Sequence, residues 1–431
     1  MQEAAHKTTA FRRRIADFLG KIPLLAWLAA APLAVLLEHL IGYELATGVG
    51  LPKIPVLFGF VIMLKTPLLI PSALLYVLLI YLIPVCLVAW VLAAPANWLA
   101  GRLYRLPIIV PVLVHLALLY LALHLWADIS AYRGLTLRLT LIAVMMTLSL
   151  NVINGYMGEF SCSHPGFMAL GAYGASVFSV FFFASDKLFG EALLPEILGA
   201  FCFPIGLVFG GLIASLGALA IAIPSFRTRG DYLAIISLAF MFIVKSAIEN
   251  LEFVGGPRGL SGQPNYASLP VVFGVAVVCV WIINNFVRST LGKALNAVRD
   301  DETAAEAMTV NTRRTKILAF MFGAFWAGVA GGLFAHVLRY VNPGTFGIQK
   351  LAEVLAMVYF GGLNSVYGSI LGGVSLSLLS EALRPLELFK WIIIPLLLIL
   401  VMIYRPTGLI AFKEFDVRAL IRPKTHPGKE V

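Results

Sequence analysis

The chain has 431 residues, of which 60% are hydrophobic and 13% charged, and its formal net charge is +10. A soluble domain of this length would carry charge on about a quarter of its residues, so the composition excludes an ordinary soluble protein. The basic residues stand in short clusters between long apolar runs, which is where membrane topology places them, so a nucleic-acid partner is also excluded.

The apolar runs predict an all-α polytopic membrane protein with about eleven or twelve transmembrane helices, because about 20 apolar residues cross the hydrocarbon core. The first run is interpreted as an uncleaved helix, and the short segment 349–363 as a half-helix or a tilted crossing. The predicted spans apart from 349–363 are, in chain order, 23–41, 67–94, 107–127, 135–155, 164–184, 197–223, 231–249, 269–287, 317–338, 366–383 and 389–404.

The distribution of Lys and Arg predicts that both termini face the cytoplasm, since cytoplasmic loops retain positive charge. If 349–363 crosses, all the basic clusters fall on one side by alternation, and the opposite loops are poorer in Lys and Arg. The basic residues counted in these clusters, apart from those of 288–316, are Lys7, Arg12, Arg13, Arg14, Lys21, Arg102, Arg105, Arg227, Arg229, Arg405, Lys413, Arg418, Arg422, Lys424 and Lys429.

One cytoplasmic stretch, "GKALNAVRDDETAAEAMTVNTRRTK" at 292–316, holds nine charges in 25 residues. It predicts a short helix over 300–309 whose start carries acidic residues, which suits the helix dipole. Residues four apart share a helix face, so Glu302 and Glu306 are expected on one face, and Ala304, Ala305 and Met308 on a small apolar one. Such a helix docks into a groove on another protein, or it is a solvated loop helix with no partner.

Two regions, 151–176 and 358–377, each combine an apolar segment, glycines with small polar residues, and a further helix. They indicate either a parallel duplication or the ordinary use of small residues at membrane helix contacts. Broken helices expose polar backbone at transporter binding sites, so polar residues there are candidates for a substrate path. They serve equally well to satisfy freed backbone groups. The candidates are Asn151, Asn154, Ser161, Ser163, His164, Asn364 and Ser365.

No catalytic or metal site is predicted. The sequence contains no GxxxxGK[ST] phosphate loop, no HExxH and no GxSxG. Its four cysteines lie scattered in apolar stretches, where small buried residues are the better interpretation. Few ionisable residues lie inside spans; Glu353, Glu159 and His164 are the main ones, and they form no evident proton relay. Ion-coupled transport is therefore disfavoured, as is a membrane enzyme.

The stretch 292–336 resembles the cytoplasmic loop and following helix of ABC importer permeases for branched-chain amino acids, specifically the M-type subunit. Five further stretches are similar to the same family in the same order: "NVINGYMGEFSCSHPGFMALGAYGA", "RTRGDYLAIISLAF", "GGPRGLSG", "FGGLNSVYGSILGG" and "YRPTGLI". Together the six span roughly 134–412, about two thirds of the chain. The family often has glycine where this chain has Thr309, and a "GHAAF"-like run where it has 163–167. Pro165 in that run is expected to disturb a helix.

The resemblance implies an ABC permease core at 131–412, containing a coupling-helix loop at 288–316, with an N-terminal extension of about three helices at 1–130 and a basic tail at 413–431. It implies a second permease subunit, two cytosolic ATPase subunits that bind ATP and Mg, a periplasmic or extracellular solute-binding protein, and a bacterial inner membrane. The chain itself would hold no cofactor. The implied ATPase-coupling residues are Arg299, Asp300, Glu302, Ala304, Ala305, Glu306 and Met308. Related permeases carry urea, amides, nucleosides or sugars, so the cargo stays open.

Overall fold

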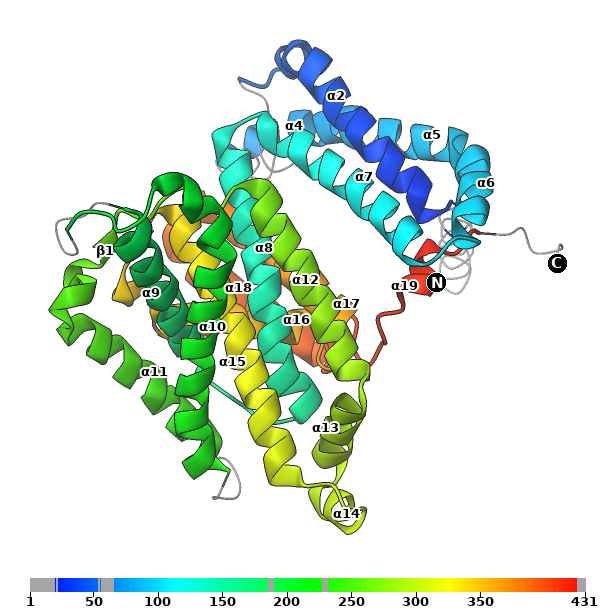
Figure 1. Ribbon diagram of the computed structural model, residues 1–431. Coiled ribbons are helices and arrows are strands. Elements are labelled where there is room, and N and C mark those ends of the chain that lie inside the picture. The colour runs from blue at the N-terminus through cyan, green and yellow to red at the C-terminus, as the bar shows by residue number, and fades with distance from the viewer. Residues whose placement is uncertain are drawn as a thin grey trace. The chain divides into compact units, whose positions relative to one another are not determined.

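The computed structural model describes residues 20, 22–52, 55, 66–184, 190–226 and 232–424, and within them it is nearly all helical (Figure 1). The chain divides into two compact units. Unit 1 comprises 1–134, 382–386 and 416–431, and unit 2 comprises 135–381 and 387–415. Several basic residues used to predict orientation lie outside the described residues: Lys7, Arg12, Arg13, Arg14, Lys21, Arg227, Arg229 and Lys429.

Unit 1 is built from apolar helices that surround a small polar centre. The Glu38 carboxylate accepts two hydrogen bonds from the Arg133 guanidinium, at 2.8 and 2.9 Å, and a third from the Tyr81 hydroxyl. The Glu38 and Arg133 side chains are 1% and 2% exposed. The elements of this unit are α2 (Leu24–Gly48), η2 (Pro67–Leu69), α4 (Ile70–Val77), η3 (Leu78–Leu82), α5 (Ile83–Val91), α6 (Ala93–Tyr104), α7 (Ile109–Asp128), η8 (Arg384–Leu386) and α19 (Val417–Ile421).

Unit 2 is a helical bundle with one short two-stranded sheet, in which Leu260 pairs with Val341 and Ser261 with Tyr340. Its elements, with α8 continuing from unit 1, are α8 (Ala131–Asn151), η4 (Val152–Met157), α9 (His164–Phe183), α10 (Glu196–Ser225), α11 (Tyr232–Asn250), η5 (Glu252–Val254), η6 (Gly256–Arg258), β1 (Leu260–Ser261), α12 (Leu269–Arg288), α13 (Thr290–Asp300), α14 (Glu302–Ala307), α15 (Thr312–Leu338), β2 (Tyr340–Val341), η7 (Pro343–Phe346), α16 (Ile348–Gly361), α17 (Val366–Ala382) and α18 (Glu387–Tyr404).

The predicted membrane helices are largely confirmed. Among the described residues, nine helical segments are long and apolar enough to span a membrane, and two shorter apolar helices, 366–382 and 389–404, follow them. The segment predicted at 67–94 spans Ile70–Val91, with π-helical η3 in its middle. The short segment predicted at 349–363 is α16, whose 14 residues rise only about 21 Å, less than the thickness of a bilayer core.

Close contact between α9, α10 and α15 depends on glycines in all three helices. A Cβ atom at Gly171 would lie 2.1 Å from the Gly328 carbonyl oxygen, and one at Gly210 would lie 2.6 Å from that of Gly171. A Cβ atom at Gly328 would in turn lie 2.6 Å from the Ala214 methyl group. Small residues allow helix backbones to approach in this way, so Gly171, in the region 151–176, lies at a helix contact of the kind that the sequence offered as one alternative.

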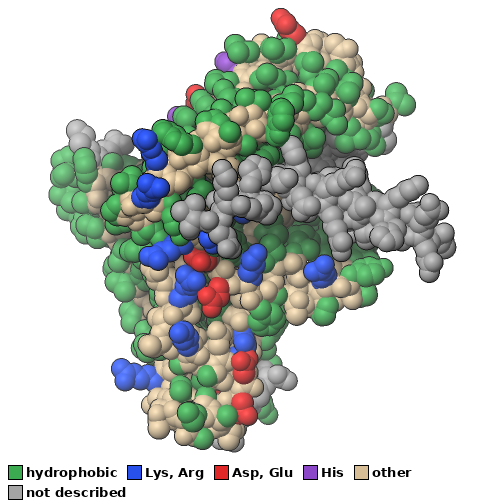
Figure 2. Space-filling model, turned by 90° about the vertical axis from the view of Figure 1, so that its right-hand side faces the viewer, with side chains coloured by type: hydrophobic (Ala, Val, Ile, Leu, Met, Phe, Trp, Pro, Cys, Tyr) green, Lys and Arg blue, Asp and Glu red, His purple; other side chains and the backbone are tan. Residues whose placement is uncertain are grey.

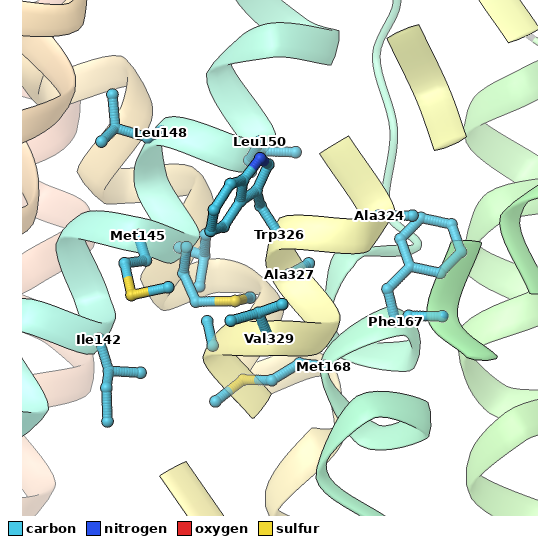
Figure 3. Close-up of a cluster of buried hydrophobic side chains, with 14 of the residues drawn as sticks. Ile142, Met145, Leu148, Leu150, Phe167, Met168, Ala324, Trp326, Ala327 and Val329 are labelled. Atoms are coloured by element: carbon cyan, nitrogen blue, oxygen red, sulfur yellow. The ribbon is translucent and has the colours of Figure 1, made fainter. Parts of the chain in front are cut away.

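Large apolar side chains fill the remaining space of unit 2. Figure 3 shows the cluster in which side chains of α8, α9 and α15 meet, among them Met145, Leu150, Phe167 and Trp326. In Figure 1 the short helices α13 and α14 lie at one end of this bundle, and the β1 strand lies at the other. The bundle therefore has two distinct ends, and polar features occur at both.

Candidate functional site

The charged stretch forms two helices: the short helix predicted over 300–309 is α14, and α13 before it was not predicted. α13 ends at Asp300, and α14 begins at Glu302, because Asp301 takes an extended conformation and caps α14 by accepting a hydrogen bond from the Ala304 N–H at 3.0 Å. Side-chain caps of this kind satisfy the free N–H groups at a helix start. Ser289 caps α13 and Asn311 caps α15 in the same way. We call residues 289–311 the elbow. Figure 2 shows Lys and Arg side chains close to Asp and Glu side chains on the face in view.

The acidic face of α14 is turned toward its own chain. The Lys316 ammonium lies 2.7 Å from the Glu159 carboxylate and 3.0 Å from that of Glu302. The Thr312 hydroxyl donates a 2.9 Å hydrogen bond to the Glu306 carboxylate. Lys316 is largely buried, so these charge-assisted contacts hold α14 against the start of α15 and against the loop after η4. A displacement of the elbow would therefore reach two membrane helices at once.

Arg299 joins the elbow to the end of α8. Its guanidinium contacts Asp300 Oδ1 at 2.7 and 2.9 Å and donates to the Gly155 carbonyl oxygen at 3.3 Å. Its aliphatic stem covers Gly158, where a Cβ atom would lie 2.3 Å from the Arg299 Cγ. Gly158 has a φ of 77°, which favours glycine, and ends the π-helical η4. Arg299 thus makes its contacts within the chain and connects α13 to η4.

The outer surface of the elbow differs from the predicted apolar face. Met308 is 77% exposed and Ala304 is exposed, whereas Ala305 is 5% exposed and packs inward. The inclusion of Ala305 in that face was wrong. Glu302 and Glu306 bind the start of α15, and in this orientation of α14 the Ala305 side chain is buried. A partner would meet Ala304 and Met308, one helical turn apart.

Thr309 occupies a backbone conformation that favours glycine. Its φ is 68°, in the left-handed region, directly after α14. A β-branched residue there costs about 1–2 kcal/mol. We expect Thr309→Gly to raise the free energy of unfolding by about 1 kcal/mol, the gain being reduced by the greater freedom of glycine in the unfolded chain. Thermal unfolding in detergent measures this. Thr303→Gly, inside α14, should instead be destabilising by about 0.5–1 kcal/mol. A loss of stability in Thr309→Gly would contradict the inference that the backbone of Thr309 is strained.

The two broken stretches predicted from the sequence lie against each other. Asn151 donates through its side-chain nitrogen to the Ser369 hydroxyl at 2.6 Å and to the Ser365 carbonyl oxygen at 3.1 Å, and its oxygen accepts from the Asn364 N–H at 3.1 Å. Gly362 and Asn364 have φ values of 131° and 54°, which break the chain between α16 and α17. Asn151 therefore satisfies freed backbone groups, and Ser365 caps α17 by accepting from the Gly368 N–H at 3.1 Å.

The polar residues before α9 form a second buried group. Asn154 accepts from the Ser161 N–H at 3.2 Å, and the hydroxyls of Ser161 and Ser163 lie 2.8 Å apart. His164 is fully buried at the first residue of α9. The prediction that Pro165 disturbs a helix was wrong. Pro165 lies in the first turn of α9, where its missing N–H would have no partner within the helix in any case. All seven predicted path residues therefore lie in or beside the two breaks.

Sequence reasoning missed a cavity of about 150 Å³ between α8, α16 and α17. Leu139, Ile142, Met146, Met168 and Met357 contribute to its apolar lining, and Thr136, Lys350, Glu353, Ser377, Ser380, Glu381 and Lys390 to its polar lining. The Lys350 ammonium lies 3.0 Å from the Glu353 carboxylate. The sequence contained one signal for this site, which is the acidic residue Glu353 in an apolar segment. It did not indicate that α8 and α17 lie beside that residue.

Comparison with known proteins shows which family the chain resembles. A family model described as "Branched-chain amino acid transport system / permease component" matches residues 132–403. The chain is similar to the high-affinity branched-chain amino acid transport system permease protein LivM of Escherichia coli K12, with 31% identity over 314 residues, 63% of this chain and 68% of the relative. It is also similar to LivH of the same strain, with 31% identity over 150 residues (34% and 48%), and to BraD of Pseudomonas aeruginosa, with 28% over 168 residues (38% and 54%). No solved structure matches the chain.

Proposed function

The chain belongs to the family of permease components of branched-chain amino acid transport systems, and from this premise we propose that it lines the membrane path of an ATP-driven importer for these amino acids. The single observation that carries the proposal is the elbow. It presents the exposed Ala304 and Met308 to a partner while Lys316 and Arg299 tie it to the ends of α15 and α8. A partner that moves the elbow would move the membrane helices.

The partner in this proposal is an ATPase. The sequence has no GxxxxGK[ST] phosphate loop, so ATP and Mg would be bound by two separate cytosolic ATPase subunits, and this chain would be no enzyme. Protein partners with a shallow groove receive a helix through a few small and apolar side chains, which Ala304 and Met308 supply. In this proposal Arg299, Asp300, Glu302, Ala305 and Glu306 position that surface and are not themselves the contact.

The similarity to both LivM and LivH indicates a second permease subunit beside this one, since the two names belong to separate permease proteins. We propose that a periplasmic or extracellular binding protein delivers the amino acid. The elbow and both termini would face the cytoplasm of a bacterial inner membrane, in keeping with the distribution of Lys and Arg. The paired breaks around Asn151 would lie on the cytoplasmic half of the path, next to the elbow.

Uptake of labelled leucine by membrane vesicles that contain the complete complex tests this function. We expect uptake to require ATP inside the vesicle lumen that corresponds to the cytoplasm, and to continue when a protonophore collapses the proton gradient at constant ATP. We expect this because the sequence places few ionisable residues inside the predicted spans, and a proton relay needs a chain of such groups. Loss of uptake on adding the protonophore, with ATP unchanged, would point to ion coupling instead.

A further inference from the structure

The cavity between α8, α16 and α17 combines a small volume, an apolar wall and charged groups of both signs. We propose that it is the entry site at which the permease takes up a zwitterionic amino acid with a branched aliphatic side chain. This inference rests on the proposed function, and it assigns that function a place in the fold separate from the paired breaks.

The size and the apolar wall fit an aliphatic side chain. A cavity of about 150 Å³ accepts a molecule of roughly benzene size, which is close to the bulk of a branched four-carbon group. Met146, Met168 and Met357 all contribute to the wall. Methionine side chains are flexible and polarizable, so they adapt to apolar groups of different shapes. The wall therefore suits leucine, isoleucine and valine together and does not single out one of them.

The charged side of the cavity fits the two ends of a zwitterion. Lys350 and Lys390 supply positive charge, and Glu353 and Glu381 supply negative charge. The Lys350 and Glu353 side chains are 21% and 24% exposed and pair at 3.0 Å. An entering amino acid can exchange partners with this pair, so that the lysine meets the carboxylate and the glutamate meets the ammonium. A ligand with only one charge would leave one member of the pair without a partner, which is costly away from water.

The cavity lies at the end of unit 2 that is remote from the elbow. The first half of α8 lines it, from Thr136 to Met146, whereas the far end of α8 continues into η4 and contacts Arg299 through Gly155. At 1.5 Å per residue, Met146 and Thr136 lie about 14 and 28 Å along the helix from Gly155. α16, whose first turns supply Lys350 and Glu353, follows β2 and η7 at that remote end. If the elbow faces the ATPase, this is the side on which a binding protein releases its cargo.

Photolabelling with a diazirine analogue of leucine locates the site directly. Vesicles that hold the complete complex and the loaded binding protein are irradiated, and the labelled peptides are identified by mass spectrometry. We expect label on the segments 136–146 and 350–357, suppressed by excess leucine. Excess leucinamide, which lacks the carboxylate, and excess 4-methylpentanoate, which lacks the amine, should not suppress it.

A double variant separates binding from folding. In Lys350→Met/Glu353→Leu the ion pair is replaced by apolar groups of similar size, a change that membrane helices should tolerate. We expect label in the cavity and leucine uptake to fall at least about tenfold, while the amount of assembled complex stays normal. The matched control is Lys245→Met/Glu249→Leu on α11, a pair at 3.8 Å that is 30% and 35% exposed and does not line the cavity. It should keep both label and uptake.

The outcomes distinguish the inference from the function on which it rests. Absence of ATP-driven leucine uptake in the unaltered complex would overturn the proposed function. If that uptake is present, label on 151–165 or 360–369 alone, or label and uptake unchanged in the double variant, would overturn the cavity as the entry site and leave the proposed function intact.

Discussion

Ala304→Arg is expected to reduce ATP-driven leucine uptake at least about tenfold and to remove the ATPase subunits from the purified complex. Ala304 is exposed one helical turn from Met308, which is 77% exposed, and the two form the small surface that a groove would receive. An arginine there places a bulky charge in the centre of the contact, where removal from water is costly. Co-purification and uptake are measured on the same preparation.

Thr303→Arg is the matched control for this change. Thr303 is also exposed on α14, but it lies about 100° around the helix from Ala304, on another face. It should leave assembly and uptake near normal. A Glu306→Arg variant is less informative, because it also breaks the hydrogen bond from Thr312. Normal assembly and normal uptake in Ala304→Arg would show that the elbow does not dock through this face.

The largest change in stability is expected for Glu38→Leu in unit 1. It leaves the Arg133 guanidinium, which is 2% exposed, without the carboxylate that accepts two of its hydrogen bonds. Removing one partner of a buried ion pair costs about 3–5 kcal/mol, because the remaining charge has nothing to replace water. Thermal unfolding of the detergent-purified chain should show this loss in the free energy of unfolding.

Glu38→Leu/Arg133→Leu provides the comparison. When both partners become apolar, no charge stays buried, and the stability should return to within about 1–2 kcal/mol of the original chain. The Tyr81 hydroxyl, which donates to Glu38, loses its acceptor in both variants, so that effect is shared between them. If the single and double variants were equally unstable, the packing of α2 would be responsible and the ion pair would not.

Much of the fold could be predicted from local sequence. Apolar length placed the spans, because it depends on residues within one segment, and the small residues of 151–176 indicated helix contacts without naming the helices that α9 would meet. The caps at Asp301 and Asn311 also follow local rules. The short helix predicted over 300–309 corresponds to α14 at Glu302–Ala307, whereas α13, which Asp301 separates from it, was not predicted.

The site depended on contacts that local sequence does not contain. Lys316 meets Glu159 across 157 positions, and Asn151 meets Asn364 across 213. Composition indicated that both breaks are polar, but it did not indicate which residues of one contact which residues of the other. It therefore could not show that Asn151 forms hydrogen bonds with residues of the second break. The cavity was missed for the same reason, because its charged residues on α16 become significant only beside α8 and α17.

The Asn151 side chain has a consequence for how the path could open. Its oxygen accepts from the Asn364 N–H, and its nitrogen donates to the Ser365 carbonyl oxygen and the Ser369 hydroxyl. The residue itself is the last of α8, next to the other break. Where water is excluded, a backbone group that loses its partner has no substitute. If one break became straight, polar groups at the other would lose their hydrogen-bond partners. The two breaks would therefore change conformation together. The permease would then have one concerted switch between α8 and α17 in place of two independent gates.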